Sequence, residues 1–561
     1  MIHLSQRAIM TAAAVFFVSA AALPAQEIHT GLPEKFDLRN LEGHSYVSQV
    51  KGQSGGTCWA HGTMAAVEGH LMMSGVWESL VSQGKESGPE PDMAEYHLDW
   101  WNGFNTFYNE DIYPDSSGLD VHYGGDYRVA AAYFSRGDGP VRDCDGQSFY
   151  TAPSLYEDTF HRFYVRDIEW YQAGRPGQDI AFLKQKIMDQ GVMATCMFYN
   201  SAFIDTNYIH CQPGFSTSDP NHSVAIVGWD DTKPTRADEP GAWLVKNSWW
   251  YTWGHGGYFW MSYYDKWAGH HPEMGAVSFI NVEPMKYDNV YYHDYHGWRD
   301  TLQTVSQGFN RFVARGDEQA EAVSFFTAAD SVVYEARIFK DFSDNELLQE
   351  AAEKTGFIEF SGFHTVDLDE SVSLAEGDTF YVYLFLSRGG HAIDRTSFVP
   401  VLLGSSAKDQ DVISAAGPGE SFIKSGALWE DLYDAYIPAN SQWQYTANLC
   451  VKALTTNVTQ TGIAGSVQPS GFVLNQNYPN PFNPSTTISY HVPSQCRVVL
   501  SVYSTLGRKV AVLVDGIQGP GTMSAAWNGM TDDGAPVSSG VYIYQLKTGS
   551  TVITKKMILT R

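Results

Sequence analysis

Cysteine is scarce in this sequence, with six residues among 561, at positions 58, 144, 196, 211, 450 and 496. None of them forms a Cys-x-x-Cys pair, which argues against a structural zinc site of the usual spacing. Their low density also argues against a disulfide-built scaffold. Cys196 and Cys211 are close enough in sequence to bridge across a hairpin, and two buried thiols are the alternative.

Basic residues are also few, with 36 Lys and Arg against 63 Asp and Glu, which gives a net charge of −27. Such a field repels phosphate, so the charge argues against nucleic acid and anionic membrane surfaces as partners. The balance of 43% hydrophobic and 18% charged residues is typical of folded domains. The chain length predicts two to four of them.

Long apolar runs are missing after the first 25 residues. Residues 1–25 combine Arg7, an apolar run over Ala8–Leu23 and small residues ending at Ala25. This layout predicts a secretory signal peptide, with an uncleaved anchor as the alternative. The mature protein is therefore expected to be secreted or at the cell surface.

Three folded regions are expected after this segment. Residues 30–285 have a helical pattern after Cys58, ended by Gly75, and strand patterns over Ser223–Trp229, Ala242–Lys246 and Tyr258–Tyr264. Helices followed by strands predict a two-lobed α+β domain.

Residues 286–455 are expected to form an all-β sandwich. Tyr334, Ala336 and Ile338 alternate with polar residues, and Phe380–Leu386 is apolar on both faces, as in a central strand. A small, polar linker is expected over 456–470.

Residues 471–561 predict a last, immunoglobulin-like sandwich. The expected strands are Thr486–Val492, Val498–Tyr503, Lys509–Val514 and Val541–Lys547.

Three separate segments carry the chemistry expected of a cysteine nucleophile. Cys58 opens a predicted helix, whose N-terminal end stabilises a thiolate, and Gln53 could help to hold an oxyanion. His222 stands at the start of one predicted strand, and Asn247 directly follows the next. If these strands pair, the Asn247 side-chain oxygen can orient the imidazole, and Trp249 can shield that bond from water.

Together these motifs resemble the papain family of cysteine peptidases over Leu32 to about Asn281. They comprise Leu32–Arg39, Val50–Gln53 with Cys58–Ala60, Gly124–Gly125, His222 in His-x-Val-x-x-Val-Gly, and Lys246–Trp249 with Gly256–Tyr258. The resemblance implies that Cys58 is the nucleophile, His222 the acid and base, Asn247 the orienting residue and Gln53 the oxyanion donor. It also implies that Gly124 and Gly125 pair with extended substrate, and that no metal or organic cofactor is needed.

Several features depart from the family pattern. Five positions separate Gln53 from Cys58 where the family has six, Trp250 stands where the family has Gly, and the Asp230–Gly241 connection is longer than usual. About six residues separate the predicted signal peptide from the mature-like start. This spacing does not accommodate the inhibitory propeptide that the family carries at this place. Activity is therefore expected to be controlled by export, by the C-terminal domains, or not at all.

The later regions carry two further resemblances. Tyr287–Tyr291 and Ala447–Ala453 resemble the ends of the lectin-like sandwich of some bacterial papain-like peptidases, and Trp298, Trp429 and Trp443 could stack on sugars or belong to the core. Gln476–Pro484 and Ser539–Tyr542 resemble the sorting module of the type IX secretion system. This second resemblance implies that the outer-membrane secretion machinery is a partner of the protein.

The sequence thus predicts a papain-like two-lobed α+β domain followed by two all-β sandwiches, acting as a secreted peptidase on proteins or peptides. Hydrolysis would proceed through a Cys58 thioester, with endopeptidase action expected. Two alternatives stay open at this stage. One is a non-catalytic surface adhesin that uses the peptidase-like domain and the sandwich for binding, and the other is acyl transfer to an amine.

Overall fold

The computed structural model describes residues 31–560 except 113–116, 172–173, 401–402, 405–408, 459–471 and short stretches of the C-terminal region (475–476, 478–479, 481, 483, 493–494, 505–507, 520 and 549–551). The predicted signal peptide lies outside the described residues, as does most of the predicted linker. The chain forms two compact units, residues 1–459 and 460–561.

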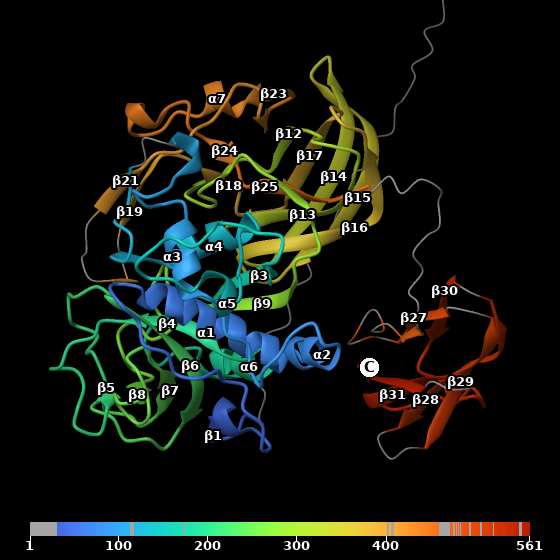
Figure 1. Cartoon of the computed structure of the whole chain (residues 1–561), viewed down its shortest axis with the longest axis horizontal. Helices are drawn as coiled ribbons and strands as arrows, with labels where there is room; N and C mark the ends of the chain where they lie inside the picture. Colours follow the sequence, from blue (N-terminus) through green and yellow to red (C-terminus); the bar gives the residue numbers. More distant parts are fainter. Residues whose placement is uncertain are drawn as a thin grey trace, which may run out of the picture. The chain divides into compact units, whose positions relative to one another are not determined.

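The helices gather in the first part of the larger unit (Figure 1). They are α1 (Cys58–Met73), α2 (Val76–Ser82), α3 (Glu95–Trp101), α4 (Tyr127–Ser135), α5 (Asp143–Gly146), α6 (Ile180–Gln190) and, later in the chain, α7 (Leu432–Ala435). The predicted helix after Cys58 is confirmed as α1. Gly75 follows it with φ +74°, a left-handed conformation that suits glycine at a helix end.

One large sheet runs through the larger unit, with the strand order β10-β25-β13-β16-β3-β9-β4-β6-β7-β8-β5 along its main path. Its strands from residues 30–285 are β3 (Phe163–Tyr171), β4 (Met193–Met197), β5 (Ile209–His210), β6 (His222–Asp230), β7 (Ala242–Lys246), β8 (Tyr258–Ser262) and β9 (Ala276–Pro284), with β1 (Lys35–Asp37) beside β6. The three strands predicted here are confirmed within a few residues.

The same sheet continues into the sandwich region. Its strands there are β10 (Asn289–Tyr291), β13 (Glu318–Thr327), β16 (Gly362–Leu374) and β25 (Val451–Asn457), with β11 (Asp300–Leu302), β18 (His391–Asp394) and β24 (Asn448–Leu449) at the side. The crossing point is the antiparallel pairing of β16 with β3, where Gly362 lies opposite Glu169. The sequence predicted separate domains and did not predict this shared sheet.

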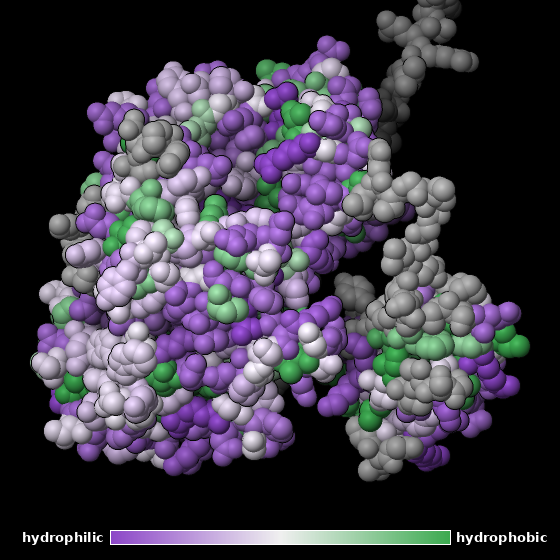
Figure 2. Space-filling view, in the orientation of Figure 1, coloured by the Kyte–Doolittle hydropathy of each residue, from purple (hydrophilic) through white to green (hydrophobic). Residues whose placement is uncertain are grey.

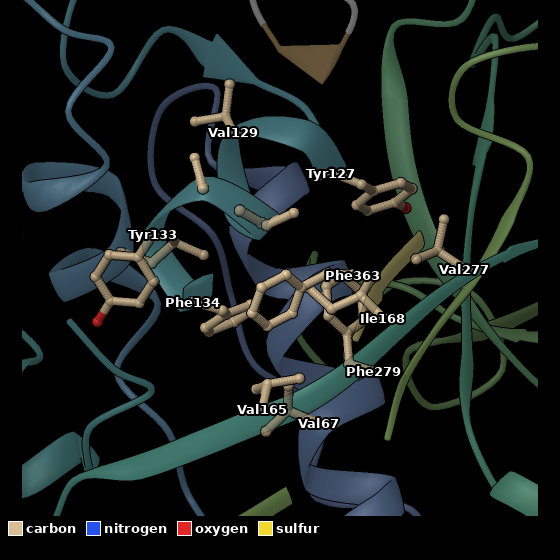
Figure 3. Close-up of a cluster of buried hydrophobic side chains, with 14 of the residues drawn as sticks. Val67, Tyr127, Val129, Tyr133, Phe134, Val165, Ile168, Val277, Phe279 and Phe363 are labelled. Carbon is tan, nitrogen blue, oxygen red and sulfur yellow. The ribbon is translucent and has the colours of Figure 1, made fainter. Parts of the chain in front are cut away.

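A common hydrophobic core underlies the crossing point (Figure 3). Phe363 of β16 packs with Ile168 of β3, Phe279 of β9 and Phe134 of α4, all at most 1% exposed. The close approach of β16 to β3 depends on glycine at position 362. A Cβ on Gly362 would lie 1.8 Å from the Ile168 carbonyl oxygen.

A six-stranded sheet, in the order β15-β14-β17-β12-β22-β23, faces the large sheet to complete the sandwich. Its strands are β12 (Gln307–Val313), β14 (Val332–Ser343), β15 (Glu346–Ile358), β17 (Thr379–Leu386), β22 (Ser421–Ser425) and β23 (Leu428–Asp431). Strand β17 is central, as its two apolar faces predicted. Tyr334, Ala336 and Ile338 point into the core as the alternation predicted.

The expected linker begins too early in the sequence-based prediction. Strand β25 runs to Asn457, because Thr456 and Asn457 still pair with the start of β13. Their small polar side chains suit an edge of the sheet as well as a linker, so composition alone did not distinguish the two.

The smaller unit is a two-sheet β-sandwich, as predicted. One sheet contains β26 (Val473–Leu474), β27 (Thr486–Val492) and β30 (Gly521–Trp527), and the other contains β28 (Cys496–Ser504), β29 (Lys509–Gln518), β31 (Gly540–Lys547) and β32 (Val552–Leu559). Tyr490, Trp527 and Tyr544 lie in its core.

Hydrophilic residues cover most of the visible face of the larger unit (Figure 2), in keeping with the excess of acidic side chains. None of the described helices has the length and apolar character needed to span a membrane.

The crossing point can be tested by adding a single methyl group. Gly362→Ala should cost about 2 kcal/mol or more in the free energy of unfolding, because β16 must move away from β3 to admit the Cβ. Urea unfolding followed by tryptophan fluorescence measures the loss. Gly214→Ala, where a Cβ meets nothing within 4 Å, is the control and should change little. Equal stability of the two variants would contradict the tight crossing.

Candidate active site

Helix α1 and strand β6 approach each other closely, and each carries one of the predicted catalytic residues at its first position. Gly62 permits the contact, since a Cβ there would lie 2.1 Å from the Ser223 hydroxyl oxygen. The same Ser223 contributes a backbone N–H that stabilises the Cys58 thiolate. The thiol and the end of the His222 strand therefore lie next to each other.

The His222 ring is held from two sides. Its Nε2 donates to Asn247 Oδ1 at 2.8 Å, which leaves Nδ1 as the ring nitrogen available to a thiol. The Trp249 ring stacks on the imidazole, with centroids 4.5 Å apart and an interplanar angle of 22°. Both contacts depend on the antiparallel pairing of β6 with β7, in which Ala225 lies opposite Lys246.

The segment before the nucleophile is a tight loop fixed by backbone contacts. Gln53 N–H donates to the Ser248 carbonyl at 2.8 Å, and Ser248 Oγ donates to Gln53 Oε1 at 2.6 Å. Gln53 Nε2 in turn donates to the Gly55 carbonyl at 3.0 Å. Gly55 has φ +66°, and a Cβ there would lie 2.6 Å from the His122 carbonyl oxygen. The five-residue step is thus closed by a glycine in a left-handed conformation.

The backbone conformation of Trp250 explains why the family has glycine at this position. Its φ is +61°, in the left-handed region that side chains disfavour. Its ring lies over Gly52, where a Cβ would come within 1.9 Å of Trp250 Cε2. The indole is 58% exposed beside the Gln53 loop.

A buried charge cluster beneath the site was missed from the sequence. Lys51 Nζ contacts carboxylate oxygens of Glu68 at 2.7 Å, Asp92 at 2.6 Å and Glu95 at 2.8 Å. Lys246 Nζ donates to Ser48 Oγ at 2.8 Å, and Ser48 Oγ donates to Glu68. The three carboxylates raise the pKa of Lys51 against the effect of burial. A sequence signal existed, because Glu68 is the one acidic residue in the otherwise buried helix α1.

The catalytic candidates are closed off from solvent. Cys58 is 1% exposed, Asn247 3% and His222 4%. Burial raises the pKa of the Cys58 thiol to about 11 although the N–H groups of Ser223, Trp59 and Cys58 oppose the rise. Burial also lowers the pKa of His222 to about 4. The N–H groups at the helix end lower the thiol pKa as expected, but desolvation outweighs them in this closed state.

Gly124 and Gly125, the pair expected to bind substrate backbone, form strand β2 and are already paired. Their partner is strand β20 (Leu403–Gly404) from the sandwich region, with Gly124 opposite Gly404 and Gly125 opposite Leu403. Gly125 lies against Trp59, since a Cβ there would be 2.6 Å from the indole. Both glycines are buried.

The remaining side chains singled out from the sequence have packing partners. All six cysteines are free thiols, so a Cys196–Cys211 bridge is absent and the two thiols are buried. Trp429 is 8% exposed, and a cation lies over the ring of each of Trp298, Trp429 and Trp443.

Two groups among the described residues have side chains that could bind a metal ion, and neither group contains a catalytic candidate. They are Asp111, His296 and Asp394, and Cys144, Asp145 and His161. Each residue of the first group makes at least one hydrogen bond within the protein.

Comparison with known proteins agrees with the geometry. Residues 32–86 and 164–275 match the papain family of cysteine proteases, residues 290–455 match the lectin-like domain, and residues 476–560 match the secretion system C-terminal sorting domain. The chain contains a papain-family cysteine protease domain. It continues with a lectin-like domain and a sorting domain, and the latter indicates secretion.

Two plant proteins are among the relatives of the papain-family domain. Cysteine proteinase 1 of Zea mays is 26% identical over 243 residues, which are 41% of this chain and 56% of that protein. The probable cysteine protease RD19B of Arabidopsis thaliana is 26% identical over 251 residues, 43% of this chain and 60% of that protein. The chain thus spans less than two thirds of the length of either relative.

Solved structures share the combined architecture. The cysteine protease and lectin-like domains of Cwp84, a surface layer associated protein of Clostridium difficile, have a TM-score of 0.60 and 21% identity, covering 76% of this chain and 89% of that one. Cwp84 after propeptide cleavage has a TM-score of 0.59 and 22% identity, covering 74% and 97%. The papain-family and lectin-like domains therefore adopt a known joint fold.

Removing the cation of the buried charge cluster should be strongly destabilising. Lys51→Met should lower the free energy of unfolding by about 3–5 kcal/mol, because it leaves three carboxylates without their cation. Chemical denaturation measures this. Lys35→Met is the matched control, since Lys35 pairs with Asp230 at the surface and should cost at most about 1 kcal/mol. Similar losses for both variants would contradict the role of the cluster.

The raised thiol pKa predicts a steep pH dependence of Cys58 alkylation. The thiolate is the reactive form, so the rate in the native protein should rise about tenfold per pH unit until near pH 11. Iodoacetamide labelling read by mass spectrometry tests this, with a short cysteine peptide as the control that levels off at about pH 8.5. A Cys58 rate that already levels off below pH 8 would contradict the closed, desolvated thiol.

Proposed function

We propose that this protein is an endopeptidase that hydrolyses peptide bonds at a Cys58–His222–Asn247 site. The observation that carries the proposal is the 2.8 Å hydrogen bond from His222 Nε2 to Asn247 Oδ1, under the Trp249 ring and beside the first residue of α1. This arrangement leaves His222 Nδ1 free to take the thiol proton. The match of residues 32–86 and 164–275 to the papain family of cysteine proteases supports the same reaction class.

The first half of the reaction transfers the acyl group to sulfur. Cys58 Sγ attacks the scissile carbonyl carbon as its proton moves to His222 Nδ1. The backbone N–H of Cys58 and the Gln53 amide, whose Oε1 is fixed by Ser248, stabilise the oxyanion. The C–N bond then breaks, and His222 gives its proton to the departing amine.

The second half returns the enzyme to its starting state. A water molecule attacks the thioester carbonyl while His222 accepts its proton, and the C–S bond breaks to release the acid. His222 then restores the Cys58 thiol. Asn247 and Trp249 keep the ring in one orientation throughout, and Gly124 and Gly125 bind the substrate backbone when they are free.

The lectin-like domain supplies a second candidate function, the binding of carbohydrate on the outer face of its six-stranded sheet. A pocket there is lined by aromatic and polar side chains: Arg337, Phe339, Asn345, Glu346, Leu347, Tyr383, Lys424 and Trp429. Aromatic rings with nearby amide and charged groups are suited to sugars. Glycan-array binding by the wild type, lost in Tyr383→Ala, would test it.

The peptidase assignment predicts that one sulfur atom is essential. Cys58→Ala should lower hydrolysis of a quenched fluorescent peptide with both ends blocked to background, because no nucleophile remains. Cys144→Ala removes an exposed thiol and should leave the rate unchanged. Residual activity of Cys58→Ala at the wild-type level would refute the site. An inactive wild type with a fully accessible Cys58 would favour the adhesin alternative.

A further inference from the structure

Strand β20 lies where the proposed peptidase needs its substrate. We propose that strand β20 (Leu403–Gly404), at the tip of a hairpin, is a built-in occupant of the substrate cleft, which blocks the cleft until the strand is displaced. This inference rests on the proposed function, because it assigns regulation to the same site. It gives the lectin-like domain a role in controlling the papain-family domain.

The first argument is the pairing itself. Gly124 and Gly125 offer their backbone groups to an extended chain, and β20 already takes them through Gly404 and Leu403. Cα atoms of β20 also come within 8 Å of Cα atoms in α1 and β6, the elements that begin with Cys58 and His222. A peptide substrate cannot use the same strand edge at the same time.

The second argument is burial. The Leu403 side chain is fully buried, in the hydrophobic cluster that also contains Cys58 and Trp59. Burying an aliphatic side chain from water is favourable. The apolar contact of Leu403 therefore holds β20 in place.

The third argument is that the tip belongs to an anchored hairpin. Strands β19 (Ser397–Pro400) and β21 (Asp409–Val412) pair in antiparallel fashion, with Pro400 opposite Asp409. Val399 and Val412 are buried in the same cluster as Leu403. The hairpin stem therefore packs on the peptidase domain at the base of the tip.

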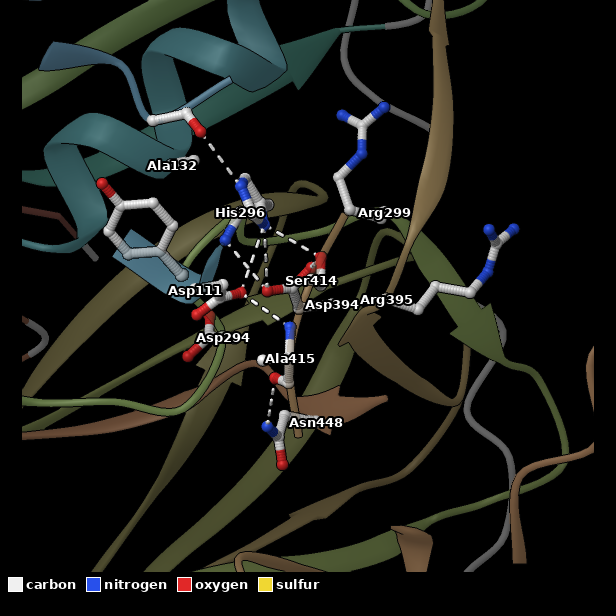
Figure 4. A network of polar contacts seen from close by, with 12 residues as sticks. Asp111, Ala132, Asp294, His296, Arg299, Asp394, Arg395, Ser414, Ala415 and Asn448 are labelled. Atoms are coloured by element: carbon white, nitrogen blue, oxygen red, sulfur yellow. Dashed lines mark hydrogen bonds and ion pairs between the residues drawn. The ribbon is translucent and has the colours of Figure 1, made fainter. Parts of the chain in front are cut away.

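A polar network surrounds both ends of the hairpin, and it ties the end after β21 to the peptidase domain (Figure 4). Asp394 precedes β19 and accepts from the His296 N–H at 2.9 Å and from Ser414 Oγ at 2.8 Å. After β21, the Ala415 N–H donates to Asp111 Oδ2 at 2.9 Å. The Asn109 side-chain amide donates to the Ile413 carbonyl at 2.9 Å. Asn109 and Asp111 belong to the peptidase domain, so the network clamps the hairpin across the two domains.

Two variants remove the occupant in different ways. Leu403→Asp places a charge in the apolar position, and a second variant replaces residues 401–408 with Asn-Gly, a turn that closes the hairpin directly after Pro400. Leu428→Asp is the matched control, since Leu428 lies on β23 and is 59% exposed. The loop replacement leaves the stem pairing intact, so it remains informative if Leu403→Asp fails to fold.

The primary measurement is the rate of Cys58 alkylation by iodoacetamide at pH 8, which reports access without requiring catalysis. Both displaced variants should label about tenfold faster or more than wild type and Leu428→Asp, as expected when an open minor state becomes the main one. Cys450 is the internal reference, because it is buried in the lectin-like domain and should label only on unfolding. Equal Cys58 rates in wild type and the loop-replaced protein would overturn the proposal.

Peptide hydrolysis, measured in parallel, separates this proposal from the proposed function. Faster labelling together with a comparable rise in kcat/KM supports both. Faster labelling without any hydrolysis supports the cleft occupant and refutes the peptidase. Hydrolysis by wild type at the rate of the loop-replaced protein, with unchanged labelling, supports the peptidase and refutes the occupant.

Discussion

The pairing of β16 with β3 is the contact on which the arrangement of the larger unit depends. It joins the sheet of the papain-family domain to one sheet of the lectin-like sandwich, over a shared core that includes Phe363 and Phe279. A flexible connection would leave two domains free to reorient. The shared sheet instead fixes the sandwich relative to the cleft, so that a hairpin far along the chain reaches Gly124 and Gly125 in a single register.

Electrostatics fixes the other side of the site. Lys51 brings together carboxylates from α1, α3 and the segment before α3, and it stands two residues before Gln53. Buried ion pairs of this kind contribute little net stability compared with apolar packing, but breaking one is costly. We interpret the cluster as a device that holds the loop before the nucleophile in one conformation.

The sequence predicted the elements of the site better than their surroundings. Local patterns were enough for α1, β6 and β7, and pairing of the last two brought Asn247 to His222. Nothing local marks Leu403 as a partner of Gly125, because the contact joins residues far apart in the chain and involves an ordinary aliphatic side chain. For the same reason the burial of the thiol was not predicted. Residue types near Cys58 indicated the N–H groups that favour the thiolate, but not the desolvation that outweighs them.

The cover over Cys58 also bears on how the protein survives export. Outside the cell a thiolate is open to stepwise oxidation, and the higher oxidation states of cysteine are not reversed there. Cys58 is 1% exposed, burial raises the pKa of its thiol, and the other described cysteines form no disulfide with which it could exchange. The burial of Cys58 therefore protects its sulfur from oxidation while the protein passes through an oxidising environment.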